Sequence, residues 1–411
     1  MKTKLIGVAL FAATASVIAF YPALKSDPVT GIDPIVATIV DPGTNFLTVI
    51  DPVTNARPKI EVVFVLDTTG SMSGLIEAAK EKIWSIATTM AQAEQAPEIR
   101  MGLVAYRDRG DAYVTQVVDL SDDLDSMYAR LMDFRANGGG DGPESVNKAL
   151  YDAVHGISWS QDQNAYKVVF LIGDAPPHMD YHDEVQYPET IKAAKARGIV
   201  VNAIQAGQNP ATMRQWRHIA ALSQGDFFNV AQDGNAVAVA TPYDADIAKL
   251  SAAMDDTRLY FGTEEEKAKQ RLKKAATAKL HASASDESRA RRAAFNASAS
   301  GKRNFLGDKE LVDAVVSGRV DMADMDAAEL PAMLQALAPE ERKSVVMEQA
   351  AMRSELEGQI KELAKKRDSF IAEKVEADGG AEDSLDHKIY RTVKRQAAAV
   401  GLSYEEAAPK Y

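Results

Sequence analysis

The chain has 411 residues, enough for two or more domains with sizeable cores. It contains no cysteine, which excludes disulfides, zinc–thiolate sites, iron–sulfur clusters, a catalytic thiol and a cysteine-linked lipid anchor. The formal net charge of −12 argues against a general nucleic-acid-binding surface, so no nucleic-acid partner is expected.

The N-terminus begins with a basic tetrapeptide, Met1-Lys-Thr-Lys4, which is followed by an apolar run over residues 5–24. This pattern is typical of an export signal. Ala13-Thr-Ala15 offers a cleavage point, but the apolar run continues past it and, at about 20 residues, is long enough for an anchor. We therefore expect residues 1–24 to be a signal peptide or an N-terminal membrane anchor, and the protein to be exported to the periplasm or cell envelope.

The next segment, residues 25–58, is punctuated by Asp-Pro pairs that begin at positions 27, 33, 41 and 51. Each proline fixes φ and removes an amide donor, which favours turns or extended breaks. This composition predicts a linker that acts as a spacer. The alternative is a decorated edge of the following domain.

Residues 59–260 alternate short apolar runs with helical patterns, which predicts an α/β fold with a doubly wound, mostly parallel, six-stranded sheet. The run at 114–118 is short and flanked by charge, which suits an antiparallel edge strand. The expected strands are 60–66, 99–106, 114–118, 167–172, 199–206 and 226–230, and the expected helices are about 75–94, 122–134, 144–156, 186–197, 210–222 and 244–258.

The remaining residues have the character of helices and linkers. Residues 261–305 predict a basic, Ala/Ser-rich linker that is a solvated helix or partly disordered, because 263–303 contain 11 Lys and Arg against 5 Asp and Glu with few apolar side chains. Thr263-Glu-Glu-Glu266 has the pattern of a capping box, which favours the start of a helix. Residues 306–411 predict an α-helical C-terminal region. Its long helix, 340–377, carries an apolar stripe that is interrupted at Arg367, so it needs a partner within the chain or in a homo-oligomer.

Side chains with oxygen atoms lie directly after two predicted strands and at the start of one predicted helix. They lie in the loops 67–73, 137–144 and 171–178, and include Asp67, Thr69, Ser71, Asp141 and Asp174. Ligands of parallel sheets bind at the carboxyl ends of the strands, where these loops would meet. Hydroxyl and carboxylate oxygens suit a hard divalent cation, with Mg²⁺ preferred and Ca²⁺ or Mn²⁺ as alternatives.

The same three loops resemble a known family. The D-x-T-G-S motif of Asp67–Ser71 after a V-V-F-V-L strand is similar to the metal-ion-dependent adhesion site (MIDAS) of von Willebrand factor type A (VWA) domains. G-G-G-D-G-P-E (138–144) and L-I-G-D-A-P-P-H (171–178) resemble loops of a bacterial exported branch. The resemblance covers about residues 58–255. It implies a doubly wound sheet and a cation that bridges to an acidic residue of a protein partner.

The resemblance also implies roles for single residues. Thr69 and Ser71 match the two hydroxyl ligands, Asp67 matches the acidic residue of the first loop, and Asp174 matches that of the third. Where the family often has a threonine ligand, this chain has Asp141. We expect Asp141 to be the ligand, and Glu144 is the second candidate. The departure would make the site more negative, so it would hold its cation more tightly but attract a partner's carboxylate less. The alternative is that Asp141 and Glu144 are helix N-terminal charges that complement the macrodipole.

Two further motifs were considered as sites. Residues 177–184 gather two histidines and three acids, which could form a second metal site or partner loop, although a polar surface loop is the simpler interpretation. Arg109-Gly110-Asp111 is interpreted as a turn between strands.

The sequence therefore predicts a non-enzymatic protein-binding module with a MIDAS-type metal site. No Ser/His/Asp set, no second Asp-Thr-Gly and no Asp-x-Asp motif completes a catalytic site at Asp67. The alternatives are an envelope scaffold that oligomerises through residues 340–377 and a metal-dependent hydrolase.

Overall fold

The computed structural model describes residues 57–140, 142–232, 239–382, 384–404 and 408–409. The expectations for the segment 1–24 and for nearly all of 25–58 therefore lie outside the described residues. Within the described ranges, no helix combines the length and the apolar character that a membrane crossing requires.

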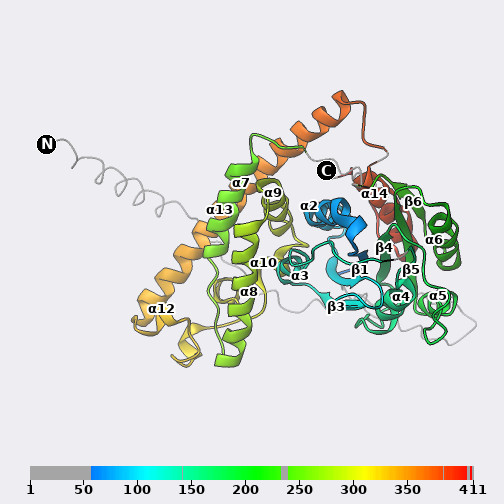
Figure 1. Cartoon of the computed structure of the whole chain (residues 1–411). Coiled ribbons are helices and arrows are strands. Elements are labelled where there is room, and N and C mark those ends of the chain that lie inside the picture. The colour runs from blue at the N-terminus through cyan, green and yellow to red at the C-terminus, as the bar shows by residue number, and fades with distance from the viewer. Residues whose placement is uncertain (1–56, 141, 233–238, 383, 405–407, 410–411) are drawn as a thin grey trace, which may run out of the picture. The chain divides into compact units, whose positions relative to one another are not determined.

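Six strands form one sheet in the order β3-β2-β1-β4-β5-β6 (Figure 1). Every neighbouring pair is parallel except β2 and β3, which are antiparallel. The predicted six-stranded, mostly parallel sheet with an antiparallel edge strand is therefore confirmed. The strands are β1 (Lys59–Asp67), β2 (Glu98–Tyr106), β3 (Thr115–Ser121), β4 (Tyr166–Gly173), β5 (Ile199–Ala206) and β6 (Phe227–Val230).

Helices cover both faces of the sheet because its central strands are apolar on both sides. In β1, Val62 and Phe64 point into one core while Val63 and Val65 point into the other. The first core is covered by α2 (Ser73–Met90) and α3 (Leu124–Leu131), and the second by α4 (Val146–His155), α5 (Tyr187–Ala196) and α6 (Pro210–Ser223). The doubly wound α/β prediction is confirmed.

The first face is completed by the last long helix of the chain, α14 (Leu385–Ala397), which continues into η4 (Ala398–Val400). Leu385, Ile389 and Val393 are at most 4 % exposed and belong to the same core as Phe170 of β4. The sequence correctly predicts a helix here but groups it with a separate helical region. The structure shows that α14 belongs to the sheet.

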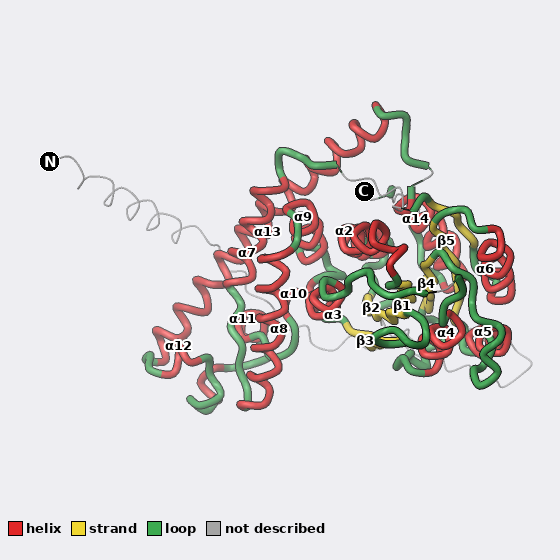
Figure 2. Tube along the Cα trace, in the orientation of Figure 1, coloured by secondary structure: helices red, strands yellow, loops and turns green. Residues whose placement is uncertain are grey.

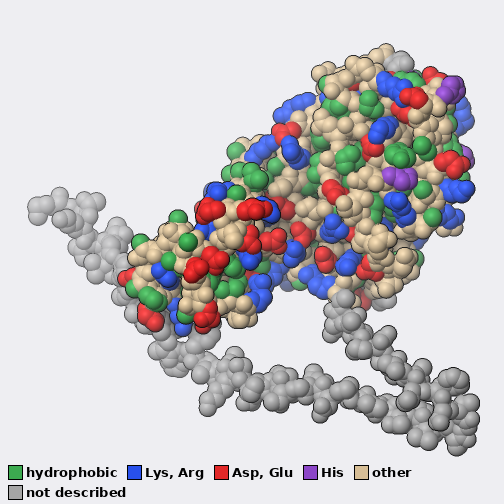
Figure 3. Space-filling view, turned by 90° about the horizontal axis from the view of Figure 1, so that it is seen from below, with side chains coloured by type: hydrophobic (Ala, Val, Ile, Leu, Met, Phe, Trp, Pro, Cys, Tyr) green, Lys and Arg blue, Asp and Glu red, His purple; other side chains and the backbone are tan. Residues whose placement is uncertain are grey.

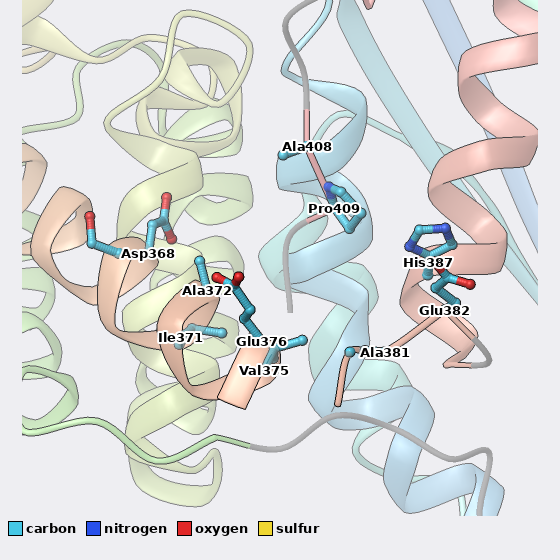
Figure 4. Close-up of a pocket in the computed structure, with 12 residues that line it drawn as sticks. Asp368, Ile371, Ala372, Val375, Glu376, Ala381, Glu382, His387, Ala408 and Pro409 are labelled. Carbon is cyan, nitrogen blue, oxygen red and sulfur yellow. The ribbon is translucent and has the colours of Figure 1, made fainter. Parts of the chain in front are cut away.

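Polar side chains fix the position of α14 on the sheet. Gln396 donates to Asn202 Oδ1 at 2.8 Å and accepts from the Tyr166 hydroxyl at 2.8 Å, and all three side chains are buried. A pocket of about 540 Å³ separates the last turns of the preceding helix from the start of α14 (Figure 4). The sheet, rather than that preceding helix, is therefore the main support of α14.

The segment between β6 and α14 is helical, and its described part contains no strand of the sheet (Figure 2). The apolar stripe of its longest helix packs inside the chain, where Ile360 is fully buried with residues of two neighbouring helices. The elements are α7 (Asp244–Asp256), α8 (Glu264–Ser283), α9 (Asp286–Asn296), α10 (Lys302–Leu306), α11 (Leu311–Val316), η3 (Met322–Asp324), α12 (Ala332–Gln335) and α13 (Pro339–Ala377).

The interruption of the α13 stripe has a structural explanation. Arg367 is buried and donates from Nε to Asp244 Oδ1 of α7 at 2.7 Å. The predicted helix 340–377 is confirmed, and its partners α7 and α9 lie within the same chain. A homo-oligomer through this helix remains a prediction.

The prediction of a linker at 261–305 is wrong over most of its length, because the packed helices α8, α9 and most of α10 occupy it, whereas the helix start predicted from the capping box at Thr263 is confirmed. Acidic residues that are distant in sequence neutralise its basic side chains. Lys273 pairs with Asp123 at 2.6 Å, and Lys302 pairs with Asp313 at 2.8 Å. On the face drawn in Figure 3, basic and acidic side chains lie interspersed. Ion pairs of this kind offset part of the positive excess along the sequence.

The strongest of these contacts is a buried cluster around Arg292 of α9. Its Nε donates to Asp125 Oδ1 of α3 at 2.7 Å, and its Nη1 donates to Asp255 Oδ2 of α7 at 2.7 Å. Although burial opposes ionisation, the Arg292 guanidinium holds the pKa of Asp125 well below its usual range. The cluster joins the helical segment to a helix that covers the sheet.

We expect Arg292→Met to lower the free energy of unfolding by about 4 kcal/mol, because two buried carboxylates lose their shared cation. Urea titration at neutral pH measures the loss, and Arg271→Met, an exposed site on α8, is the control. The folded pKa of Asp125 is depressed, so its stabilisation is present above the usual aspartate pKa of 3.8 and lost below it. The difference between wild type and variant should shrink as the pH falls through that value. An unchanged urea midpoint at neutral pH would contradict the assignment.

Candidate metal centre at the carboxyl edge of the sheet

The first loop is a compact turn in which strand β1 ends on Asp67. Asp67 Oδ1 accepts hydrogen bonds from the Thr69 amide at 2.9 Å and from Thr69 Oγ1 at 2.7 Å. Thr69 Oγ1 lies 3.4 Å from Ser71 Oγ. The short helix η2 (Gly70–Met72) then leads into α2. The alternate spacing therefore brings all three predicted oxygen ligands of this loop together.

The second loop crosses the first, and its glycines permit the close approach. Gly70 N donates to Gly138 O at 3.1 Å. Gly138 and Gly139 have φ of +76° and +80°, and a Cβ at Gly138 would collide with the carboxylate of Asp111. A Cβ at Gly139 would lie 3.3 Å from Thr69 Cβ and 3.4 Å from Glu144 Oε1. The backbone at Gly139 therefore lies between the first loop and the Glu144 carboxyl.

The prediction for Asp141 lies outside the described residues. The second candidate, Glu144, is described and is 4 % exposed. Its amide donates to Pro176 O at 2.9 Å, which ties the second loop to the third.

The third loop brings Asp174, which follows β4. Gln232, just past β6, donates from Nε2 to Asp174 Oδ2 at 2.7 Å and to Ser71 O at 3.1 Å, so it links the third loop to the first. At the end of β4, a Cβ on Gly173 would lie 3.1 Å from Asp67 Oδ2 and 2.5 Å from the Tyr106 hydroxyl. Only glycine leaves room for these two oxygens.

Burial and neighbouring carboxylates raise the pKa values of the acidic groups at this edge. Burial raises the pKa of Asp67 to about 7, against the hydrogen bonds from Thr69 and with a further contribution from Asp174. Burial also raises the pKa of Glu144 to about 9, with the Asp67 carboxylate adding to the effect. The pKa of Tyr106 is raised well above its usual value by burial and by the same acids.

Three buried oxygens at this edge have no hydrogen-bond partner among the described residues, namely Asp67 Oδ2, Glu144 Oε2 and Tyr106 Oη. Buried polar atoms are normally paired, and a bound ion is one recognised partner for those that are not. The residues therefore fit a divalent cation. Across the described residues, no three His, Asp or Glu side chains are placed to hold a metal by themselves. A cation would need the hydroxyls of Thr69 and Ser71 as well.

Sequence reasoning missed two residues of this edge, Tyr106 and Gln232. Tyr106 is the last residue of the predicted strand 99–106 and lies beside Asp67 in the sheet. Its position at a strand end could therefore have identified it as a residue of this edge. Gln232 belongs to no motif and shows its role only in three dimensions.

The two neighbouring motifs have structural roles. Asp111 of Arg109-Gly110-Asp111 turns inward and accepts from the Gly139 amide at 3.1 Å. His178 lies between Asp180, 2.8 Å from Nδ1, and Asp108, 3.3 Å from Nε2. Arg109 pairs with Asp183 at 2.9 Å. These contacts agree with a turn and a polar surface loop.

Comparison with known families identifies the sheet. The family model described as "von Willebrand factor A domain" matches residues 61–241. The chain contains a VWA domain. The matched range ends after β6, so it includes β1 to β6 and α2 to α6 but not α14. The resemblance seen in the motifs is confirmed at this level.

Individual relatives are distant. The alpha-protein kinase vwkA of Dictyostelium discoideum is 30% identical over 129 residues, which are 31% of this chain and 20% of that protein. The chain thus spans about a fifth of this relative. The SpRpn10 VWA domain is 14% identical with a TM-score of 0.33, covering 43% of this chain and 89% of that one. Proximal thread matrix protein 1 of the mussel byssus is 15% identical with a TM-score of 0.34, covering 43% of each.

Proposed function

We propose that the VWA domain is a non-enzymatic module that grips a protein partner through a divalent cation at the carboxyl edge of its sheet. The observation that carries the proposal is the set of unpaired buried oxygens of Asp67, Glu144 and Tyr106 beside the hydroxyls of Thr69 and Ser71. VWA domains generally mediate protein–protein interactions, which agrees with a protein partner.

The proposed ligands are Asp67, Thr69, Ser71 and Asp174, together with Asp141 or Glu144. Mg²⁺ is the preferred cation because it accepts few carboxylates and keeps open positions, and Ca²⁺ and Mn²⁺ are alternatives. When bound, the cation would neutralise the acids of the edge and offer a position for an acidic side chain of the partner. Glu144 is buried, and a Cβ at Gly139 would contact both its Oε1 and the Thr69 side chain, which supports Glu144 as a ligand.

We further propose that the protein is exported to the cell envelope and belongs to a bacterial exported branch of the family. The basic start and the apolar residues 5–24 support export. The curated relative comes from Dictyostelium, so the bacterial assignment rests on the loop motifs alone. N-terminal sequencing of the mature protein would distinguish a cleaved signal from a retained anchor.

Catalysis is not part of the proposal. The kinase name of the Dictyostelium relative describes a protein of which this chain covers 20%. A metal-dependent hydrolase would need a general base beside the cation, and the acids proposed at this edge are assigned as ligands of the cation.

An oligomeric scaffold is the second candidate function. Met347, Met352 and Phe370 of α13 are 50%, 44% and 37% exposed. These side chains leave apolar surface on the helix after its inner stripe is packed. Light scattering of a Met347→Lys/Met352→Lys variant tests this. An oligomer mass identical to that of wild type would count against assembly through α13.

Partner capture tests the main proposal. The immobilised full chain should retain an envelope protein in Mg²⁺, release it in EDTA, and fail to retain it as Asp67→Ala. Asp246→Ala, on the exposed face of α7, is the matched control and should behave as wild type. Capture that survives both chelation and Asp67→Ala would overturn the adhesion mechanism.

A further inference from the structure

A groove beside the edge strand β3 is rich in arginine. It has a volume of about 560 Å³ and is formed by one side of β3 and the end of α3. The side chains that matter for its chemistry are Arg107, Arg130, Arg135, Tyr113 and Phe134.

The charges of these arginines are not compensated by acids in the part of the chain that the structure describes. Arg107 donates from Nε to Thr68 O at 3.1 Å and from Nη2 to Arg135 O at 2.8 Å. Arg135 donates to the carbonyls of Met132 and Phe134. These backbone acceptors fix the guanidinium groups but carry no negative charge.

The remaining charges of the groove leave it positive. Arg130 is exposed, and no described acid lies in ion-pair contact with it. The one acid in the lining, Asp133, is already paired with Lys279 at 2.5 Å. The groove is thus a positive surface on a chain with a net charge of −12. Its charge complements an anionic ligand.

The strand that lines the groove has one open edge. β3 is the last strand of the sheet and pairs with β2 on one side, and no described strand pairs with its other side. Consecutive residues 116–118 line the groove, and Val117 is 44% exposed. An open edge of this kind is a template for an extended segment, which gains main-chain hydrogen bonds.

The groove adjoins the candidate metal centre through Thr68. The Thr68 hydroxyl lies 2.7 Å from the Tyr113 hydroxyl, and its carbonyl accepts from Arg107. Its neighbours in sequence are Asp67 and Thr69, two of the proposed ligands. Thr68 itself is fully buried, so it couples the two sites through its hydrogen bonds.

We propose that this groove binds an extended, acidic segment of a protein partner, which adds to β3 as a further strand and places its carboxylates on the exposed Arg130 and Arg135, above the buried charge of Arg107. The identification of this partner with the one held at the metal centre rests on the proposed function. Arginine recognises carboxylates in a forked geometry, and the strand edge selects an extended backbone.

Fluorescence anisotropy of a fluorescein-labelled octaglutamate peptide on the full chain tests the proposal. Arg130→Glu should weaken binding at least about tenfold, whereas Arg214→Glu, with the same charge change on exposed α6, should leave it unchanged. An octaglutamate with alternate N-methylated amides should also bind at least about tenfold more weakly, because it cannot pair with the strand. Equal affinities for Arg130→Glu and Arg214→Glu, or for the two peptides, would overturn the proposal.

Repeating the titration in EDTA and with Asp67→Ala separates the two proposals. Binding that resists both treatments but is lost in Arg130→Glu supports the groove and counts against the metal contact. Binding that requires the cation and Asp67 but ignores Arg130 supports the metal contact and overturns the groove. Displacement of the peptide by equimolar inorganic phosphate would show an anion site rather than a peptide groove, and would also overturn it.

Discussion

A chain truncated after Asp378, which lacks α14, should not fold into a stable sheet. The truncation removes Leu385, Ile389 and Val393 from the core on one face of the sheet, together with Leu402 and Tyr404, all at most 4 % exposed. At roughly 2 kcal/mol for each buried apolar side chain, the loss is about 10 kcal/mol, which is comparable to the total stability of a domain. Circular dichroism and thermal unfolding of the purified chain measure the effect.

Two variants control the truncation experiment. A chain that ends at Tyr404 keeps these core residues and should melt close to the wild-type temperature. Ile389→Ala should cost about 3 kcal/mol, whereas Arg391→Ala, exposed on the same helix, should cost little. A cooperative wild-type-like melt of the chain truncated after Asp378 would show that α14 is dispensable, against the packing described here.

Asp67→Asn should abolish stabilisation by Mg²⁺ while leaving the chain folded. Asp67 is fully buried, and its pKa is raised by burial and by Asp174, so the acid destabilises the fold without a cation. In EDTA, the variant should therefore melt at the wild-type temperature or above it. With Mg²⁺ at about 100 times its Kd, wild type should gain about 2.7 kcal/mol, or a few degrees in Tm.

Differential scanning calorimetry in EDTA and in Mg²⁺ measures both effects. Asp246→Asn, an exposed acid on α7, serves as the control and should keep the full response to Mg²⁺. A Mg²⁺ response of wild-type size in Asp67→Asn would exclude Asp67 from the site.

Local patterns were sufficient to predict the sheet but not the role of its last helix. The apolar runs and their flanks give the strands within two to three residues, including the antiparallel edge β3, because each face of a parallel sheet requires its own apolar side chains. The amphipathic pattern of 385–397 shows that this helix has a buried face. It does not show which surface that face covers, and the sheet lies more than 150 residues earlier in the sequence.

The prediction of a linker at residues 261–305 was wrong for a related reason. An excess of Lys and Arg predicts an exposed segment only if no acidic residue from elsewhere in the chain pairs with it. Arg292 is buried because it pairs with acids of α3 and α7. Such pairing depends on the tertiary structure and leaves no local pattern.

The part of the candidate site that could be predicted from the sequence is the part whose residues lie close together in the chain. Asp67, Thr69 and Ser71 lie on one turn, so their spacing alone brings their oxygens together. Asp174 follows from the rule that strand ends meet at one edge. The burial of Glu144 against the first loop could not be predicted from the sequence, because it is a property of the folded chain.

Electron paramagnetic resonance of Mn²⁺ titrated into the full chain tests the central claim most directly, because free and bound Mn²⁺ give different spectra and no partner is needed. The account predicts about one bound ion per wild-type chain, displaced by excess Mg²⁺ and absent in Asp67→Asn. Equal Mn²⁺ binding by wild type and Asp67→Asn, or no bound Mn²⁺ in wild type, would contradict a cation site at the carboxyl edge of the sheet.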